Sequence, residues 1–359
     1  MSVRATVSVF LLLSGCPETA ETSSGGVGAA STNTGAASST GSSATGGSST
    51  TGGSGGNGGA SPGGAGGSGA AGGSGGNGGA PVGGSGGAGG DPYPDRVRIV
   101  AANLTSGNFQ AYDPGHGARI LAGLNADIVL IQEFNYQSST TESLDALTED
   151  ICEGFDCVWV RGQPQVGIPN GVISRYPILE SGSWPDPEVA NRDFTYARID
   201  VPGPTDLWAI SVHLLTSSAA DRAMEASSIL GEVMALPAGD FVVLGGDFNT
   251  DTRDEPALVT LAASFTVGPL FPMDQAMNGG TNEPRTKPYD WVLADAELES
   301  TAVPTFVGGS SFESGAVIDT RVFTPLSALS PALLNDSGAP SMQHMAVVRD
   351  FVLPLSEEP

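Results

Sequence analysis

The chain has 359 residues, with 14 Lys and Arg against 39 Asp and Glu, which gives a formal net charge of −25 at pH 7. Tight, non-specific binding to duplex nucleic acid normally uses several cationic side chains that contact phosphates. The charge therefore argues against a high-affinity or processive DNA-binding protein.

The N-terminus has the pattern of a bacterial lipoprotein signal. A single early Arg4 precedes an apolar run at residues 7–13, and Leu13-Ser14-Gly15-Cys16 fits a lipobox. We expect a signal peptide at 1–15, lipidation of Cys16, and a protein attached to a bacterial cell envelope only through that lipid, facing the periplasm or the cell surface. The alternative is an ordinary secretory signal in which Cys16 occurs by chance.

Residues 16–90 are mostly Gly, Ser, Ala, Thr and Asn and include no aromatic residue. Such a composition cannot build a core, so we expect a disordered tether, whose typical reach is about 45 Å. The remaining residues, 91–359, suffice for one large α/β domain, which we expect to be monomeric.

Within this domain, apolar and β-branched runs alternate with polar segments. Ser218 before Asp221, followed by apolar residues at helical spacing, predicts a helix up to about Met234, and a second helix is expected at 115–124. The apolar runs predict strands near residues 96–103, 127–133, 156–161, 170–175, 194–201, 206–214, 240–247, 289–294 and 345–352.

Polar side chains of types used in phosphoryl chemistry lie at the ends of these strands. Asp247 and Asn249 follow the run Phe241-Val242-Val243-Leu244 and share one face, because side chains in a strand alternate with a period of two. Asp can hold an attacking water or share a hard cation, and an Asn amide can donate to a phosphate oxygen. Taken alone, the segment could equally be a strand-to-turn signal. The other strand-end residues are Asn103, Glu133, His213, Asp290 and His344.

In content and order, these motifs resemble the endonuclease/exonuclease/phosphatase superfamily, which includes deoxyribonuclease I, exonuclease III and sphingomyelinases. The resemblance covers about residues 95–354 and rests on Asn103, Ile131-Gln132-Glu133, the strand from Asn170, Val212-His213-Leu214 and Gly246-Asp247-Phe248-Asn249. It implies a four-layer α/β sandwich of two packed mixed β-sheets flanked by helices.

The resemblance also implies a mechanism. Mg²⁺, or Mn²⁺, would bind Glu133 with help from Asn103, because hard cations prefer oxygen ligands. Asp247 would orient or deprotonate the attacking water, Asn249 and His213 would bind phosphate oxygens, and Asp290 would hold His344 as a dyad. Individually, His213 could be a core histidine and Glu133 a buried structural acid.

One position departs from the family pattern. Gln343 stands where the family carries an Asp that adds a carboxylate to the metal site, so we expect Gln343 to ligate weakly and the metal affinity to be reduced. Arg175 and Arg192 could clamp phosphate, although surface Arg residues are more often ion-pair partners.

Cys152 and Cys157 are the two cysteines of the domain and are separated by four residues. In an exported protein we expect them to form a local disulfide, worth about 2–3 kcal/mol at most.

Together, these features predict an exported, metal-dependent phosphoesterase whose leading substrate is the phosphodiester bond of nucleic acid. A bound cation would offset the negative charge locally. Two alternatives remain: a phosphatase or phosphodiesterase of a small phosphorylated metabolite or lipid headgroup, and a surface binding lipoprotein with weakened catalysis.

Overall fold

The computed structural model describes residues 92–108 and 110–355. The expected signal peptide, Cys16 and the tether lie outside these residues. Among the described helices, none is long and apolar enough to cross a membrane.

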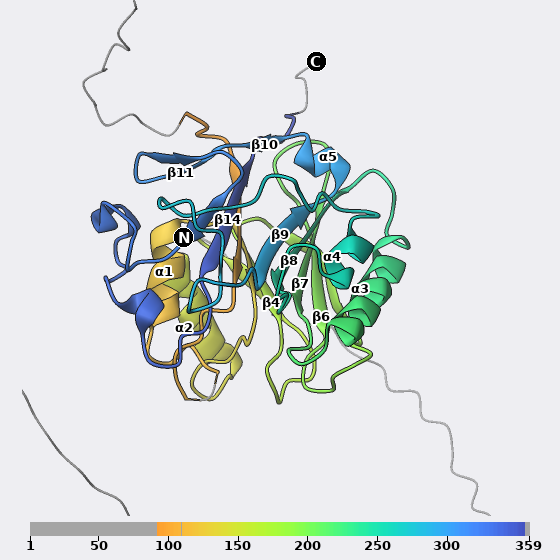
Figure 1. The fold of residues 1–359 in the computed structure, drawn as a ribbon, viewed down its shortest axis with the longest axis horizontal. Helices are drawn as coiled ribbons and strands as arrows, with labels where there is room; N and C mark the ends of the chain where they lie inside the picture. Colours follow the sequence, from red (N-terminus) through yellow and green to blue (C-terminus); the bar gives the residue numbers. More distant parts are fainter. Residues whose placement is uncertain (1–91, 109, 356–359) are drawn as a thin grey trace, which may run out of the picture. The chain divides into compact units, whose positions relative to one another are not determined.

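Two mixed β-sheets form the centre of the domain (Figure 1). The larger sheet has the strand order β10-β14-β1-β2-β4-β3, and β13 also pairs with β14. Its strands are β1 (Val97–Ala102), β2 (Ile128–Ile131), β3 (Val158–Arg161), β4 (Gly171–Ser174), β10 (Ala302–Val303), β13 (Ala316–Ile318) and β14 (Ala346–Phe351). The smaller sheet, in sequential order, contains β5 (Ile178–Trp184), β6 (Phe194–Ile199), β7 (Leu207–His213), β8 (Phe241–Asp247) and β9 (Asp290–Ala294). A separate hairpin joins β11 (Thr305–Val307) to β12 (Ser310–Phe312).

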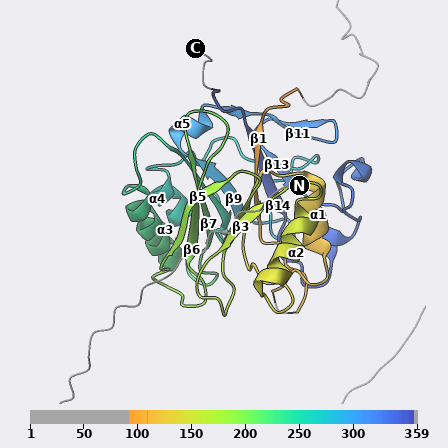
Figure 2. The same ribbon diagram turned by 180° about the vertical axis from the view of Figure 1, so that it is seen from behind.

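Helices cover the outer face of each sheet (Figures 1 and 2). Helices α1 (His116–Leu124) and α2 (Thr141–Ile151) pack on the larger sheet, and α3 (Ala219–Val233) and α4 (Pro256–Leu261) pack on the smaller one. A third apolar cluster fills the space between the two sheets. The expected four-layer sandwich is confirmed. The short helix α5 (Ala296–Glu299) follows β9.

Several elements were not expected from the sequence. The sequence does contain a pattern typical of a helix at α2, because Thr140 can cap it and Leu144, Leu147 and Ile151 have helical spacing. In the structure Thr140 caps the helix and these three residues lie on one buried face. Strand β5 is an edge strand whose residues are mostly exposed or half-buried, so it lacks the apolar run of a central strand. The two predicted helices are confirmed, and the Ser218 side chain caps α3 by accepting from the Asp221 amide.

The same β-α-β unit occurs once in each sheet. Strand β1 runs parallel to β2 through α1, and β7 runs parallel to β8 through α3. Because the carboxyl ends of parallel strands meet at one edge, β1 and β2 deliver Asn103 and Glu133 together, while β7 and β8 place His213 opposite Asp247. Each sheet therefore presents half of the predicted site.

A polar contact joins the two sheets directly below these strand ends. The Gln132 side-chain amide donates to Ser211 Oγ at 2.9 Å, and Ser211 Oγ donates to the Ile131 carbonyl at 2.9 Å. Gln132 and Ser211 are fully buried. Gly246 makes room for this contact, because a Cβ there would lie 2.0 Å from the Val212 carbonyl oxygen and 2.6 Å from Gln132 Nε2.

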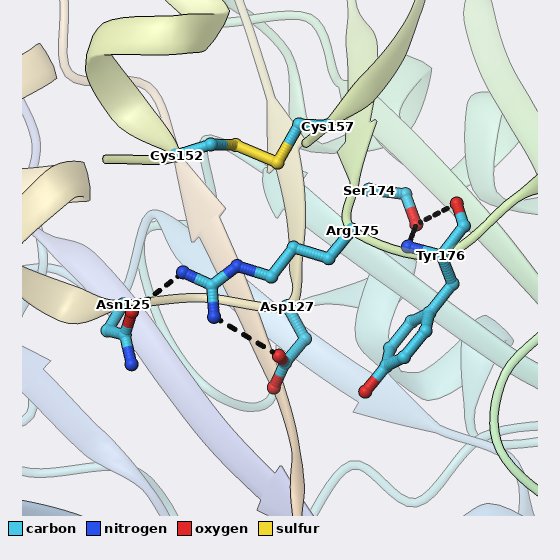
Figure 3. Close-up of a disulfide and its surroundings, with 7 residues drawn as sticks. All are labelled: Asn125, Asp127, Cys152, Cys157, Ser174, Arg175 and Tyr176. Atoms are coloured by element: carbon cyan, nitrogen blue, oxygen red, sulfur yellow. Dashed lines mark hydrogen bonds and ion pairs between the residues drawn. A yellow bond between two sulfur atoms is a disulfide. The ribbon is translucent and has the colours of Figure 1, made fainter. Parts of the chain in front are cut away.

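Cys152 and Cys157 form a disulfide that links the end of α2 to the segment before β3, with a Cα–Cα distance of 6.4 Å (Figure 3). It lies near Arg175 and Asp127, at the amino-terminal end of β2. It is therefore at the opposite end of that strand from Glu133.

We expect Gly246→Ala to lower the free energy of unfolding by at least about 3 kcal/mol, because the new methyl group overlaps the inter-sheet contact and the residue has φ +138°. Gly231→Ala on α3 is the control. It has no neighbouring atom within 4 Å of the added Cβ and should stabilise the protein by about 1 kcal/mol. Urea denaturation measures both, and equal midpoints for Gly246→Ala and the parent protein would contradict the proposed packing role.

Candidate active site

The seven strand-end residues singled out in the sequence converge in one buried cluster. They come from both sheets, and each is at most 5% exposed. The seven are Asn103, Glu133, His213, Asp247, Asn249, Asp290 and His344.

Asn103 and Glu133 lie at the ends of β1 and β2 in the larger sheet. Asn103 Nδ2 donates to Glu133 Oε1 at 3.3 Å and to Asp247 Oδ2 at 3.0 Å. Thr105 Oγ1 donates to the other Glu133 oxygen at 2.9 Å. Glu133 has φ +52°, a left-handed conformation that non-glycine residues rarely adopt and that is found preferentially at functional sites.

Asp247 lies at the centre of the cluster and contacts its members from both sheets. Its Oδ2 lies 3.0 Å from Asn103 Nδ2, 3.2 Å from His213 Nε2 and 3.4 Å from His344 Nε2. Its Oδ1 accepts from the Asn249 amide at 2.9 Å. These contacts fix the orientation of the carboxylate. A group that positions a water or accepts a proton needs such a fixed orientation.

His344 lies between two carboxylates. Its Nδ1 is 3.0 Å from Asp290 Oδ2 and its Nε2 is 3.4 Å from Asp247 Oδ2, while the Asp290 amide donates to Thr281 Oγ1 at 2.7 Å. With an acceptor at each ring nitrogen, this geometry favours the doubly protonated imidazolium.

The pKa shifts follow from burial and from these contacts. Burial opposes the charged form of His344, but Asp247 and Asp290 outweigh it and raise the pKa of His344 to about 10. Burial raises the pKa of Asp247 to about 6, although His344 acts in the opposite direction. For His213, burial and the positive charges of Arg192 and His344 lower the pKa well below its ordinary value. At neutral pH the cluster thus holds one charged and one neutral histidine.

Two groups of side chains in the cluster could hold a metal ion. One ligand atom from each of Asp247, Asp290 and His344 lies within 4.8 Å of the others. An imidazolium cannot coordinate a metal, however, so the protonation of His344 disfavours that group.

The Asn103 and Glu133 pair fits a hard cation better. Asn103 Oδ1 is buried and has no hydrogen-bond partner within the described residues. Burial raises the pKa of Glu133, which means that its carboxylate is poorly compensated, despite hydrogen bonds from Thr105 and Asn103. An oxygen-binding cation between these groups would compensate both.

Asn249 also has a left-handed backbone, with φ +51°. Its Nδ2 donates to the Leu214 carbonyl at 3.0 Å, which fixes the plane of the side-chain amide at the edge of the cluster. The second amide hydrogen remains able to donate to a substrate oxygen.

Gln343 and Arg175 lie apart from the cluster. Gln343 is exposed, and in the described structure no hydrogen bond joins its side chain to Asn103 or Glu133. Arg175 pairs with Asp127 and donates to Asn125 Oδ1 at 2.7 Å, beside the disulfide (Figure 3). It is therefore an ion-pair partner distant from the predicted metal ligands.

From the sequence, Arg192 was interpreted as a phosphate clamp or as a surface ion-pair partner. In the structure it has another role, which is to hold the main chain. It is 5% exposed, and its guanidinium donates to the main-chain carbonyls of His213 at 2.6 Å and Leu214 at 3.1 Å. It thus braces the segment that carries His213. Thr105 was also missed, although its position two residues after Asn103 would have placed both on one face of an extended chain.

Comparison with known proteins agrees with this architecture. A structure of an endonuclease/exonuclease/phosphatase from Bacteroides vulgatus shares 14% identity and covers 72% of this chain and 99% of its own, with a TM-score of 0.50. SmcL matches at 16% identity over 72% of this chain and 100% of its own (TM-score 0.47), and humanized D. rerio TDP2 at 16% over 72% and 99% (TM-score 0.46). At 14% identity, the Bacteroides vulgatus structure supports the fold alone. No curated protein matches the chain.

The sequence profile described as the Endonuclease/Exonuclease/phosphatase family matches residues 82–311. This range includes Asn103, Glu133, His213, Asp247, Asn249 and Asp290, and it ends before His344. The chain therefore belongs to the endonuclease/exonuclease/phosphatase family, whose members are typically phosphoester hydrolases that depend on a divalent metal.

Proposed function

We propose that this protein is a metal-dependent phosphoesterase that hydrolyses phosphodiester bonds, with nucleic acid as the leading substrate. The observation that carries the proposal is the position of Asp247, a buried carboxylate within 3.0–3.4 Å of Asn103, His213 and His344. A proton acceptor, a neutral imidazole and a charged imidazole around one point suit attack on a phosphate group.

In this proposal Asn103 and Glu133 hold Mg²⁺, or Mn²⁺, with Gln343 as a weaker ligand if its exposed side chain turns inward. Such a cation would neutralise phosphate charge and favour the developing charge of the transition state. Thr105 and Asn103 orient the Glu133 carboxylate, which a hard cation requires because its coordination geometry is strict.

The remaining residues bind and transfer protons. Asp247 orients the attacking water and accepts its proton, which a carboxylate with a raised pKa does more readily than an ordinary Asp. His213 and Asn249 donate to phosphate oxygens, and the backbone of His213 is held by Arg192. His344, held by Asp290, places a fixed positive charge beside the reacting phosphate.

A second candidate is a small phosphorylated metabolite or a lipid headgroup as substrate, and the distribution of charge favours it. Thirteen Lys and Arg lie in the described residues, and ten of them form ion pairs with Asp or Glu. The other three, Arg161, Arg192 and Arg253, donate to carbonyl or amide oxygens. Few cations remain for a long polyanion, so a nuclease of this kind would bind its substrate loosely.

Export and lipid anchoring complete the proposal. The lipobox at Leu13-Ser14-Gly15-Cys16 supports a lipid-anchored monomer in a bacterial cell envelope. The Cys152–Cys157 disulfide also supports it, because such bonds persist in oxidising compartments.

Asp247→Asn should lower kcat by about 100- to 10,000-fold, because the carboxamide cannot accept the proton of the attacking water. The assay uses the full chain with Mg²⁺ or Mn²⁺ on plasmid DNA, RNA, bis-p-nitrophenyl phosphate, p-nitrophenyl phosphate and sphingomyelin. Asp200→Asn, an exposed acid next to the far end of β6, should leave the rate unchanged. Turnover that Asp247→Asn retains would refute the mechanism. Absence of metal-dependent turnover on the whole panel would favour a binding protein.

The pH dependence of kcat/KM should have two limbs. Activity should fall as the pH drops through about 6, because Asp247 becomes protonated; with the cation bound, this limb lies at a lower pH. Activity should fall again as the pH rises through about 10, because His344 loses its proton. Asp290→Asn removes one of the negative charges that raise the pKa of His344, so the alkaline limb should move to lower pH. Identical alkaline limbs in the two proteins would contradict the role given to the dyad.

Cys16→Ser should move the full chain from the membrane fraction to the soluble fraction, because the thioether that carries the lipid cannot form. Fractionation of the bacterial envelope followed by immunoblotting measures this. Ser14→Ala, two residues earlier in the lipobox, is the control and should remain in the membrane. Equal partitioning of Cys16→Ser and the parent protein would leave the ordinary secretory signal as the explanation.

A further inference from the structure

Tyr112 lies in the loop between β1 and α1 and is completely buried beneath the Asn103 and Glu133 pair. Its hydroxyl accepts from the Leu104 amide at 3.2 Å and faces the carbonyls of Ala102 at 3.1 Å and Gln132 at 3.3 Å. One oxygen atom thus contacts the main chain on both sides of Asn103 and immediately before Glu133.

The backbone of Tyr112 completes this arrangement. Its amide donates to the Asn135 carbonyl at 3.0 Å, two residues after Glu133. Asn103 and Glu133 are each flanked on both sides by contacts to the same tyrosine. Among the described residues, these contacts add to the β1–β2 ladder hydrogen bond from the Gln132 amide to the Ala102 carbonyl at 3.2 Å.

The local backbone needs such support. Glu133 ends its strand in a left-handed conformation, which persists only where surrounding contacts over-determine it. The loop that carries Tyr112 is itself braced, because the Ser106 amide donates to the Ala111 carbonyl and Ser106 Oγ lies 2.8 Å from His116 Nδ1. Tyr112 is therefore held firmly enough to transmit a fixed geometry to both strand ends.

The tyrosine hydroxyl suits this task chemically. It can accept from Leu104 while it donates to a carbonyl, which phenylalanine cannot do. Burial raises the pKa of Tyr112 far above its ordinary value, so the hydroxyl retains its proton throughout the working pH range.

We propose that Tyr112 is a positioning residue for the metal site and sets the separation and orientation of Asn103 and Glu133 through the main chain on either side of them. The inference rests on the proposed function, because that function places the cation on these two side chains. It assigns to the loop after β1 a role in metal affinity that its sequence does not reveal.

The test compares Mn²⁺ binding to the full-length protein and to Tyr112→Phe, measured directly by electron paramagnetic resonance of free Mn²⁺. Residues that orient metal ligands typically contribute 10- to 100-fold to metal affinity, so the Kd should rise by about 10-fold or more. The Mn²⁺ concentration for half-maximal phosphodiester hydrolysis should rise in parallel. At saturating Mn²⁺, kcat should recover to within about twofold, because the catalytic side chains are intact.

Two control variants separate positioning from a general structural effect. Tyr196→Phe removes the hydroxyl of a half-buried tyrosine on β6 that stacks on Trp184, and it should leave the Kd unchanged. Ile199→Val removes one methylene group from the inter-sheet core and should lower the melting temperature without changing the Kd.

The outcomes are distinguishable. A raised Kd in Tyr112→Phe alone supports the inference, whereas equal Kd values in Tyr112→Phe and the parent protein overturn it and leave the proposed function intact. A parent protein that binds no Mn²⁺ overturns both. A Kd that rises equally in Tyr112→Phe and in Ile199→Val also overturns it, because stability alone would then explain the change.

Discussion

The site depends on the buried contact that fixes the two β-sheets relative to each other. Gln132 and Ser211 join the sheets by side-chain hydrogen bonds, and Gly246 leaves the space that the contact needs. Each of these residues directly precedes, or lies two residues before, a residue of the cluster. Without this contact, a small rotation between the sheets would separate Glu133 from His213 and Asp247. In a family whose catalytic groups come from two sheets, precise packing of the core is therefore a requirement of the chemistry as well as of stability.

Charge balance within the cluster is compatible with the cation site proposed above. Glu133, Asp247 and Asp290 face two positive charges, the imidazolium of His344 and the buried guanidinium of Arg192, because His213 is neutral. The cluster therefore keeps a net negative charge in a buried site, where uncompensated charge is costly.

Glu133 and Asn249 both adopt a left-handed backbone conformation, which costs the fold free energy of unfolding. Each costs of order 1–3 kcal/mol and turns a side chain at the end of a strand toward the cluster. Asp247 and Leu214 hold Asn249, while Tyr112, Phe134 and Asn135 surround Glu133 with main-chain contacts. The fold by itself does not identify the substrate, because the same fold can serve different functions.

Local sequence patterns were sufficient to predict the family, two of the helices and the residues of the cluster, because strand ends with Asn, Glu, His and Asp are visible as local patterns. Period-two alternation and capping signals depend only on near neighbours in the chain. Only the three-dimensional structure revealed which strand ends meet and that Gln343 is exposed. The contacts of Arg192 with the His213 main chain, and of Tyr112 with the main chain beside Asn103 and Glu133, also became apparent only there. The edge strand β5 could also be recognised only in the structure, because it lacks the apolar run that predicts a central strand. These features rest on contacts between residues far apart in sequence, and on burial, which local patterns do not encode.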